Sequence, residues 1–141
     1  DIKSLNVLLV DKYDPKKLPV IKLIDFGLTK RQSNNTLLEC TPAYASPELI
    51  NFHEHNESLD IYSFGIFMWE VFARDFPFKN VPKDEIFRRV LQGDRPEIEK
   101  MEAITPNEIR NLYKRCIAKE MDERPKIEEV VEVLNTIYLK C

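Results

Sequence analysis

The 141-residue sequence is poor in cysteine and histidine and has no excess of basic residues. Its three cysteines, Cys40, Cys116 and Cys141, show no CxxC spacing, which argues against a disulfide framework and favours a reducing compartment. A net charge of −3 gives no basic field that would hold nucleic acid and no polybasic membrane anchor. The two histidines, His53 and His55, lack a matching cluster elsewhere, so solvated loop residues are the expected reading and a metal site the alternative.

The sequence also lacks a long apolar run, an internal repeat and a signal-peptide pattern. Its longest apolar stretch, IYSFGIFMWEVF at residues 61–72, is flanked by charges and predicts a buried helix rather than a membrane span. A content of 43% hydrophobic and 32% charged residues is typical of a globular domain. Together with the reduced cysteines, these features favour a cytoplasmic location, and we expect no membrane-spanning segment.

Two short apolar runs near the start of the chain predict a β-hairpin. NVLLV at residues 6–10 and VIKLI at residues 20–24 are rich in aliphatic and β-branched side chains. The polar connection DKYDPKKLP between them contains two prolines and reads as a long loop.

The hairpin register decides which polar residues meet at its open end. A register in which paired residue numbers sum to 31 places Val7 opposite Ile24 and Asn6 opposite Asp25, with Asp1 on the same rim. Directly opposed residues of an antiparallel pair lie about 4.5–5.5 Å apart. Oxygen ligands that converge in this way suit Mg²⁺, and a third carboxylate could orient a nucleophile for phosphoryl transfer. The alternative, that all three are ordinary turn residues, stays open on spacing alone.

The pattern of the rest of the sequence predicts helices. The first spans about residues 58–73 and is apolar on every side, which is typical of a buried helix. Asp84 is expected to cap a second helix that Gly93 ends. TPNE at residues 105–108 predicts a capping box, and Pro125 the start of the last helix. The expected core positions of that last helix are Ile127, Val130, Val131, Leu134 and Ile137. The predicted fold is therefore mainly α with one small hairpin.

Five motifs occur in the order in which protein kinases carry them. DIKSLN (1–6) resembles the second half of the catalytic loop H-R-D-x-K-x-x-N, and IDFG (24–27) resembles the metal-binding D-F-G. SPE (46–48) stands where kinases carry A-P-E. SLDIYSFGIFMWE (58–70) resembles the long buried helix of the kinase C-lobe, and ERPKIEEVVEVL (123–134) the Arg-Pro start of its last helix. The resemblance covers essentially residues 1–141 and implies the C-terminal lobe of a protein kinase domain that starts within the catalytic loop.

The resemblance implies a role for each polar residue of the hairpin end. Asp1 would be the catalytic base, and Lys3 would steady the transferring γ-phosphate of ATP. Asn6 and Asp25 would bind Mg²⁺, and Gly27 would allow the backbone turn after the D-F motif. ATP and Mg²⁺ are thus the implied cofactors.

The resemblance also assigns residues 25–48 to the activation segment. Ser33 and Thr36 are its phosphorylation candidates, since an added phosphate could order the segment against basic residues. Thr41 is expected to be structural and to contact both the catalytic base and the lysine.

Three further residues would hold the fold around this segment. Glu48 is expected to pair with Arg124 and so attach the end of the activation segment to the helical body. Asp60 lies in an otherwise apolar helix, where it would hold backbone N–H groups of the catalytic loop. A first-turn Asp favoured by the helix dipole is its alternative reading.

The substrate class follows from mixed signals. Lys3 and the stretch CTPAYASPE (40–48) follow the Ser/Thr pattern, whereas SFGIFMWE (63–70) and RPKIEEVVEVL (124–134) look like tyrosine kinases. This mixture is typical of the tyrosine-kinase-like group, which mostly phosphorylates Ser and Thr. We expect an ATP-dependent kinase of protein substrates whose N-lobe lies upstream, with the isolated chain inactive. A pseudokinase or scaffold without turnover is the competing expectation.

Overall fold

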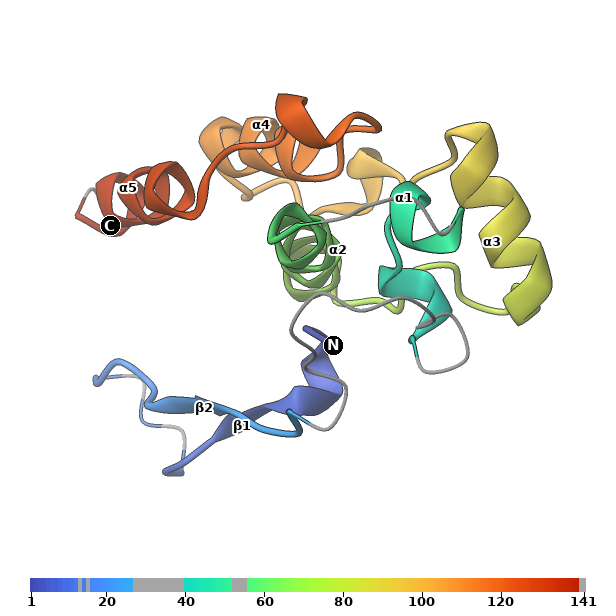
Figure 1. Cartoon of the computed structure of the whole chain (residues 1–141). Coiled ribbons are helices and arrows are strands. Elements are labelled where there is room, and N and C mark those ends of the chain that lie inside the picture. The colour runs from blue at the N-terminus through green and yellow to red at the C-terminus, as the bar shows by residue number, and fades with distance from the viewer. Residues whose placement is uncertain (13, 15, 27–39, 52–55, 140–141) are drawn as a thin grey trace.

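The computed structural model describes residues 1–12, 14, 16–26, 40–51 and 56–139 (Figure 1). Its regular elements are the 3-10 turn η1 (Ser4–Asn6), the strands β1 (Val7–Leu9) and β2 (Ile21–Leu23), the turn η3 (Pro42–Tyr44), the helices α1 (Pro47–Ile50), α2 (Ser58–Ala73) and α3 (Lys83–Gln92), the turn η4 (Ile98–Lys100), the helix α4 (Asn107–Cys116), the turn η5 (Met121–Glu123) and the helix α5 (Ile127–Tyr138). The expected class, mainly α with a small antiparallel sheet, is confirmed. Within the described residues, no helix is both long and apolar enough to cross a bilayer.

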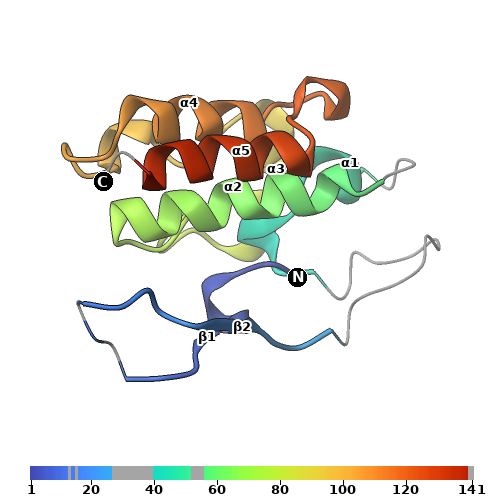
Figure 2. The same ribbon diagram turned by 90° about the vertical axis from the view of Figure 1, so that its left-hand side faces the viewer.

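The helix α2 lies at the centre of the molecule. Figure 1 views α2 nearly end-on and shows α4 and α5 above and to the left of it, α1 and α3 to the right, and the hairpin below, near the N-terminus. In Figure 2, α4 and α5 run along one side of α2 and the hairpin lies on the opposite side. The bounds of α2 are those expected from its apolar run, and its buried side chains include Tyr62, Ile66 and Trp69. Burial is not complete on every side, because Val71 is 52% exposed.

A close approach of α2 and α4 depends on Gly65. A Cβ atom at this position would lie 2.7 Å from the Cβ of Cys116 and 2.9 Å from the Cγ2 of Ile117. Contacts this short are not tolerated between carbon atoms, so the backbone of α2 reaches the end of α4 only because residue 65 has no side chain.

The hairpin register differs from the expected one by one residue. Val7 pairs with Leu23 and Leu9 with Ile21, so paired numbers sum to 30 and the expected register is wrong. The N–H of Ile24 donates to the carbonyl of Asn6 at 2.8 Å, which places Asp25 one position beyond Asn6. Both runs carry apolar residues on both faces, so their hydrophobic pattern does not specify a register.

Two predicted helix starts are also corrected. Asp84 lies in the first turn of α3, whose N-cap is Pro82, although Gly93 ends this helix at φ 99° as expected. The N-cap of α4 is Pro106, and the Thr105 hydroxyl is buried without a hydrogen-bond partner among the described residues, so the capping box is not formed.

The last helix buries a narrower stripe than expected. Its N-cap is Lys126, one residue after Pro125. Val130 is 1% exposed, and Leu134 and Ile137 pack partly buried against the core. Ile127 and Val131, 54% and 48% exposed, are not core residues, so the prediction is wrong for both.

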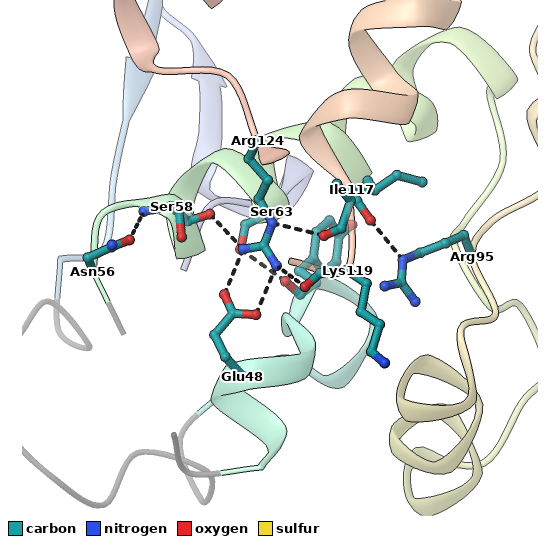
Figure 3. A network of polar contacts seen from close by, with 10 residues as sticks. Glu48, Asn56, Ser58, Ser63, Arg95, Ile117, Lys119 and Arg124 are labelled. Atoms are coloured by element: carbon teal, nitrogen blue, oxygen red, sulfur yellow. Dashed lines mark hydrogen bonds and ion pairs between the residues drawn. The ribbon is translucent and has the colours of Figure 1, made fainter. Parts of the chain in front are cut away.

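A buried ion pair joins α1 to the segment before α5 (Figure 3). The Nη1 and Nη2 atoms of Arg124 donate to the two carboxylate oxygens of Glu48 at 2.6 and 2.8 Å. The same guanidinium donates to the carbonyls of Ser58, Ala118 and Lys119 at 3.1, 3.0 and 3.2 Å. It also lies 5.1 Å from the centre of the Tyr62 ring. The expected pair is therefore present, and Arg124 also satisfies carbonyls from two other segments.

The environment of this pair favours its charged form. Burial alone would raise the pKa of the Glu48 carboxyl, but the hydrogen bonds and the charge of Arg124 outweigh it and hold that pKa below its usual range. The side chain of Arg124 is fully buried and that of Glu48 is 6% exposed. Neither group could lose its partner without leaving a charge or a strong acceptor uncompensated inside the protein.

Gly65→Val should destabilise the fold, because the added side chain forces α2 and α4 apart. Overpacking of a well-packed core costs about 1–3 kcal/mol, which urea unfolding of the complete polypeptide that contains this chain measures. Asn135→Val, at an exposed position of α5, is the control and should change the free energy of unfolding by about 0.5 kcal/mol or less. Equal effects of the two substitutions would contradict the close approach.

Arg124→Ala should lower the free energy of unfolding by about 3–5 kcal/mol, since it leaves the Glu48 carboxylate buried and unpaired. The matched control is Arg115→Ala, which removes the exposed pair of Arg115 with Glu129 and should cost at most about 1 kcal/mol. Arg124→Lys should not restore stability fully, because an ammonium cannot bind both oxygens in parallel. A loss no larger than that of the control would refute a supporting role for the buried pair.

Candidate functional site

Three side chains from two distant segments meet in one hydrogen-bonded cluster. Lys3 donates from Nζ to the Oδ2 of Asp1 and, at 2.8 Å, to the Oγ1 of Thr41. The Thr41 hydroxyl in turn donates to the Oδ1 of Asp1 at 3.0 Å. The side chains of Asp1 and Lys3 are 8% and 17% exposed, which weakens competition from water. Thr41 thus contacts the expected base and the expected lysine at once.

Short turns at both segments place these groups. Lys3 directly precedes η1, which closes with a hydrogen bond of 3.0 Å from the N–H of Asn6 to the carbonyl of Lys3. Thr41 directly precedes η3, where the N–H of Tyr44 donates to the Thr41 carbonyl at 3.0 Å. Lys3 and Thr41 are therefore each followed directly by a hydrogen-bonded turn, which fixes the direction of the backbone at both positions.

Asn6 lies beneath this cluster and is 5% exposed. Its Nδ2 donates to the carbonyl oxygen of Asp1 at 2.8 Å and to the Oδ2 of Asp1 at 3.2 Å. This orientation makes Oδ1 the atom of Asn6 that would bind a cation. Asp25 lies at the same end of the hairpin, exposed and with a φ of 61°, a backbone conformation that is uncommon outside glycine and concentrates at functional sites.

These donors fit a magnesium ion better than a transition metal. An amide oxygen from Asn6 and a carboxylate from Asp25 are hard ligands, and Mg²⁺ typically takes one or two protein carboxylates and completes its shell with phosphate and water. In the described part of the chain no three His, Cys, Asp or Glu side chains gather into a metal cluster. The residues present therefore suit a cation that a phosphate ligand shares with the protein.

Three expected site residues, Gly27, Ser33 and Thr36, lie outside the described residues, and their roles stay predictions. Glu48 and Arg124 form the buried pair described above, away from the cluster of Asp1.

Asp60 differs from its expected environment. It lies in the first turn of α2 and is exposed, although most of its neighbours on this helix are apolar. No hydrogen bond joins its side chain to residues 1–6 in the part of the chain that the structure describes. The position fits the alternative reading, a first-turn carboxylate near the positive end of the helix dipole.

A second set of contacts, which was not predicted from the sequence, joins the same two segments. Glu70 of α2 is 8% exposed, and its carboxylate accepts hydrogen bonds from the Ser4 hydroxyl at 2.7 Å and the Tyr44 hydroxyl at 2.6 Å. Burial and the neighbouring Glu70 raise the pKa of the Tyr44 hydroxyl, which therefore stays protonated and able to donate. An acidic residue inside the apolar run IFMWEVF was the available signal, because a buried carboxylate needs donors.

Comparisons with a family model and with known proteins point to the same family. The family model described as "Protein kinase domain" matches residues 1–134. A probable LIM domain-containing serine/threonine-protein kinase of Dictyostelium discoideum is 35% identical over an alignment of 140 residues, which covers 97% of this chain and 14% of that protein. A dual specificity protein kinase of the same organism is 33% identical over an alignment of 151 positions, which covers 99% of this chain and 27% of that protein.

The chain therefore spans well under a third of the length of these two relatives. The match to the family model includes both segments that build the cluster of Asp1, Lys3 and Thr41. The chain belongs to the protein kinase domain family.

Proposed function

We propose that this chain forms the C-terminal part of a catalytic domain that transfers the γ-phosphate of ATP to serine and threonine hydroxyls of proteins. The observation that carries the proposal is the cluster of Asp1, Lys3 and Thr41, in which a carboxylate, an ammonium and a hydroxyl are held within hydrogen-bond distance. Phosphoryl transfer requires little more of a protein than positioning and charge stabilisation, and these groups supply both.

The geometry supports one role for each group. The Asp1 carboxylate would orient the substrate hydroxyl and take its proton as the oxygen attacks the γ-phosphorus and the bond to ADP breaks. The Lys3 ammonium, already beside Asp1, would balance the negative charge on the transferring group. Asn6 and Asp25 would hold Mg²⁺, which would supply positive charge to balance the phosphates.

The choice of serine and threonine rests on Thr41. Its hydroxyl contacts both Asp1 and Lys3, and it lies in the stretch CTPAYASPE (40–48), which follows the Ser/Thr pattern. One relative is named a serine/threonine-protein kinase and another a dual specificity protein kinase. Transfer to tyrosine is therefore an outcome that the substrate assay must include.

We also propose an N-terminal lobe that covers the hairpin and completes the nucleotide site. The hairpin exposes a set of large apolar side chains, each 45–57% exposed: Leu8, Leu9, Val10, Val20, Ile21 and Leu23. Exposed apolar surface of this extent is unusual for a monomeric protein and is typical of an interface. We propose that the preceding part of the same polypeptide supplies this cover.

The isolated 141-residue chain should neither transfer phosphate at a useful rate nor melt cooperatively as a monomer, because its hairpin is uncovered. Thermal unfolding followed by circular dichroism, with the molecular mass checked by light scattering, measures this. The control is the complete polypeptide, which should melt cooperatively. A sharp transition of the monomeric 141-residue chain would contradict the need for cover.

Asp1→Asn in the complete polypeptide should lower kcat for transfer from ATP to a mixture of Ser, Thr and Tyr peptides by about 10²–10⁴-fold, the usual contribution of a general base. Asp122→Asn, an exposed carboxylate of η5, is the matched control and should leave kcat unchanged. A rate that does not respond to Asp1→Asn would overturn the proposed role. Nucleotide binding by the wild type without transfer would instead favour a pseudokinase.

A further inference from the structure

The connection between β1 and β2 is longer than a hairpin requires. The paired strands end at Leu9 and Ile21, and one more hydrogen bond of 2.8 Å joins the N–H of Val10 to the carbonyl of Val20. Beyond it lie residues 11–19, here called the hairpin tip, of which the structure describes all but 13 and 15. Most β-hairpin loops have about 2–5 residues. Figures 1 and 2 show this end of the hairpin outside the packed helices, where a long loop is free to bind a partner.

A hydrogen-bonded turn orders part of the hairpin tip. The N–H of Lys17 donates to the carbonyl of Asp14 at 3.0 Å, and the N–H of Lys16 donates to the Oδ1 of Asp14 at 2.9 Å. An aspartate commonly initiates a turn in this way, because its side chain accepts from the backbone two residues later. Lys16 and Lys17 are therefore adjacent, exposed side chains on an ordered backbone.

The hairpin tip and the residues beside it differ in charge from the rest of the chain. Residues 10–22 contain four lysines and two aspartates and carry +2, whereas the whole chain carries −3, so the remaining residues carry −5. In the ranges that the structure describes, no ion pair joins Lys12, Lys16 or Lys17 to a carboxylate. Of the two aspartates, Asp14 already accepts from its own turn. The ammonium groups of the tip are thus available to an anionic partner.

We propose that the hairpin tip is a docking site for an acidic segment of a partner protein, which carries an apolar side chain beside its carboxylates. The three lysines of the tip would pair with the carboxylates. Leu18, which is 67% exposed, would contact the apolar side chain. The tip lies beyond the paired strands, so a partner could bind there while the proposed N-terminal lobe covers the apolar faces of β1 and β2. This binding role is separate from phosphoryl transfer.

The charge of the rest of the chain favours a short protein segment over a membrane or a nucleic acid. A lipid surface or a duplex presents negative charge over an area much wider than the tip. The residues outside 10–22, with their charge of −5, would be repelled by such a surface within a Debye length of about 8–10 Å. A short acidic segment contacts the tip alone and avoids most of this repulsion.

The test measures the binding of two short fluorescent peptides to the complete polypeptide by fluorescence anisotropy. One peptide has glutamates on both sides of a pair of leucines, and the other has lysines in place of the glutamates. The acidic peptide should bind with a Kd of about 10–100 µM, which should rise about 5-fold when the salt concentration is raised from about 0.05 to 0.3 M. Lys16→Glu combined with Lys17→Glu should raise this Kd about 10-fold or more, and Leu18→Ser about 5-fold. The double variant should instead prefer the basic peptide, because the sign of its tip is reversed.

Two control variants separate docking at the tip from general effects of charge and hydrophobicity. Lys83→Glu combined with Lys114→Glu makes the same change of net charge at exposed positions of α3 and α4, and Ile104→Ser removes a side chain that is 84% exposed. Both controls should leave the Kd of the acidic peptide unchanged. All substituted positions are exposed, so every variant should keep the melting temperature of the wild type.

Three outcomes would overturn the proposal. The first is no saturable binding of the acidic peptide, and the second is an equal loss of binding in the tip variant and the lysine control. The third is binding of phosphatidylserine vesicles or of a DNA duplex that depends on Lys16 and Lys17, without binding of the acidic peptide. Peptide binding needs no phosphoryl transfer, so this test gives its answer whether or not the proposed function holds.

Discussion

The packing of α1, α2 and the segment after α4 depends on the contacts of one group, the guanidinium of Arg124. It binds the carboxylate of Glu48 and carbonyls from the start of α2 and the end of α4, so one fully buried side chain joins segments far apart in sequence. Burial of this charge is tolerated because nearly every donor has an acceptor. The end of the segment that contains Thr41 is thereby attached to the helical body before any contact in the site itself is considered.

The helix α2 connects Arg124 with the candidate site. Its first turn meets Arg124 through the carbonyl of Ser58, and its second turn places the Tyr62 ring beside the same guanidinium. Its last turns present Glu70 to the segments of Ser4 and Tyr44. Gly65 sets how near α4 can approach and so fixes the position of the helix in the core. Polar contacts at both ends of one buried helix give the site a rigid base, which a surface loop could not provide.

The sequence predicted the parts of this structure that depend on one strong local signal. The bounds of α2 follow from an apolar run of one helical length, and the Glu48–Arg124 pair follows from two motifs. The hairpin register could not be read, because a strand that is apolar on both faces pairs equally well when shifted by one residue. Glu70 was missed for a different reason: its partners lie 66 and 26 residues away in turns that no local pattern connects to the helix.

The two halves of the candidate site differ in what holds them. Asp1, Lys3 and Thr41 are supported by η1, η3 and α2, and their side chains contact one another directly. Asp25 depends on a hairpin with three residue pairs whose apolar side chains are exposed on both faces. A two-stranded hairpin has little stability of its own in water, so its position must be fixed by whatever covers those faces. The helical body therefore holds the half of the site that is proposed to orient the nucleophile. Under the proposed function, the half that would hold Mg²⁺ depends on the cover of the hairpin, so we expect cation binding to be the step most sensitive to the rest of the polypeptide.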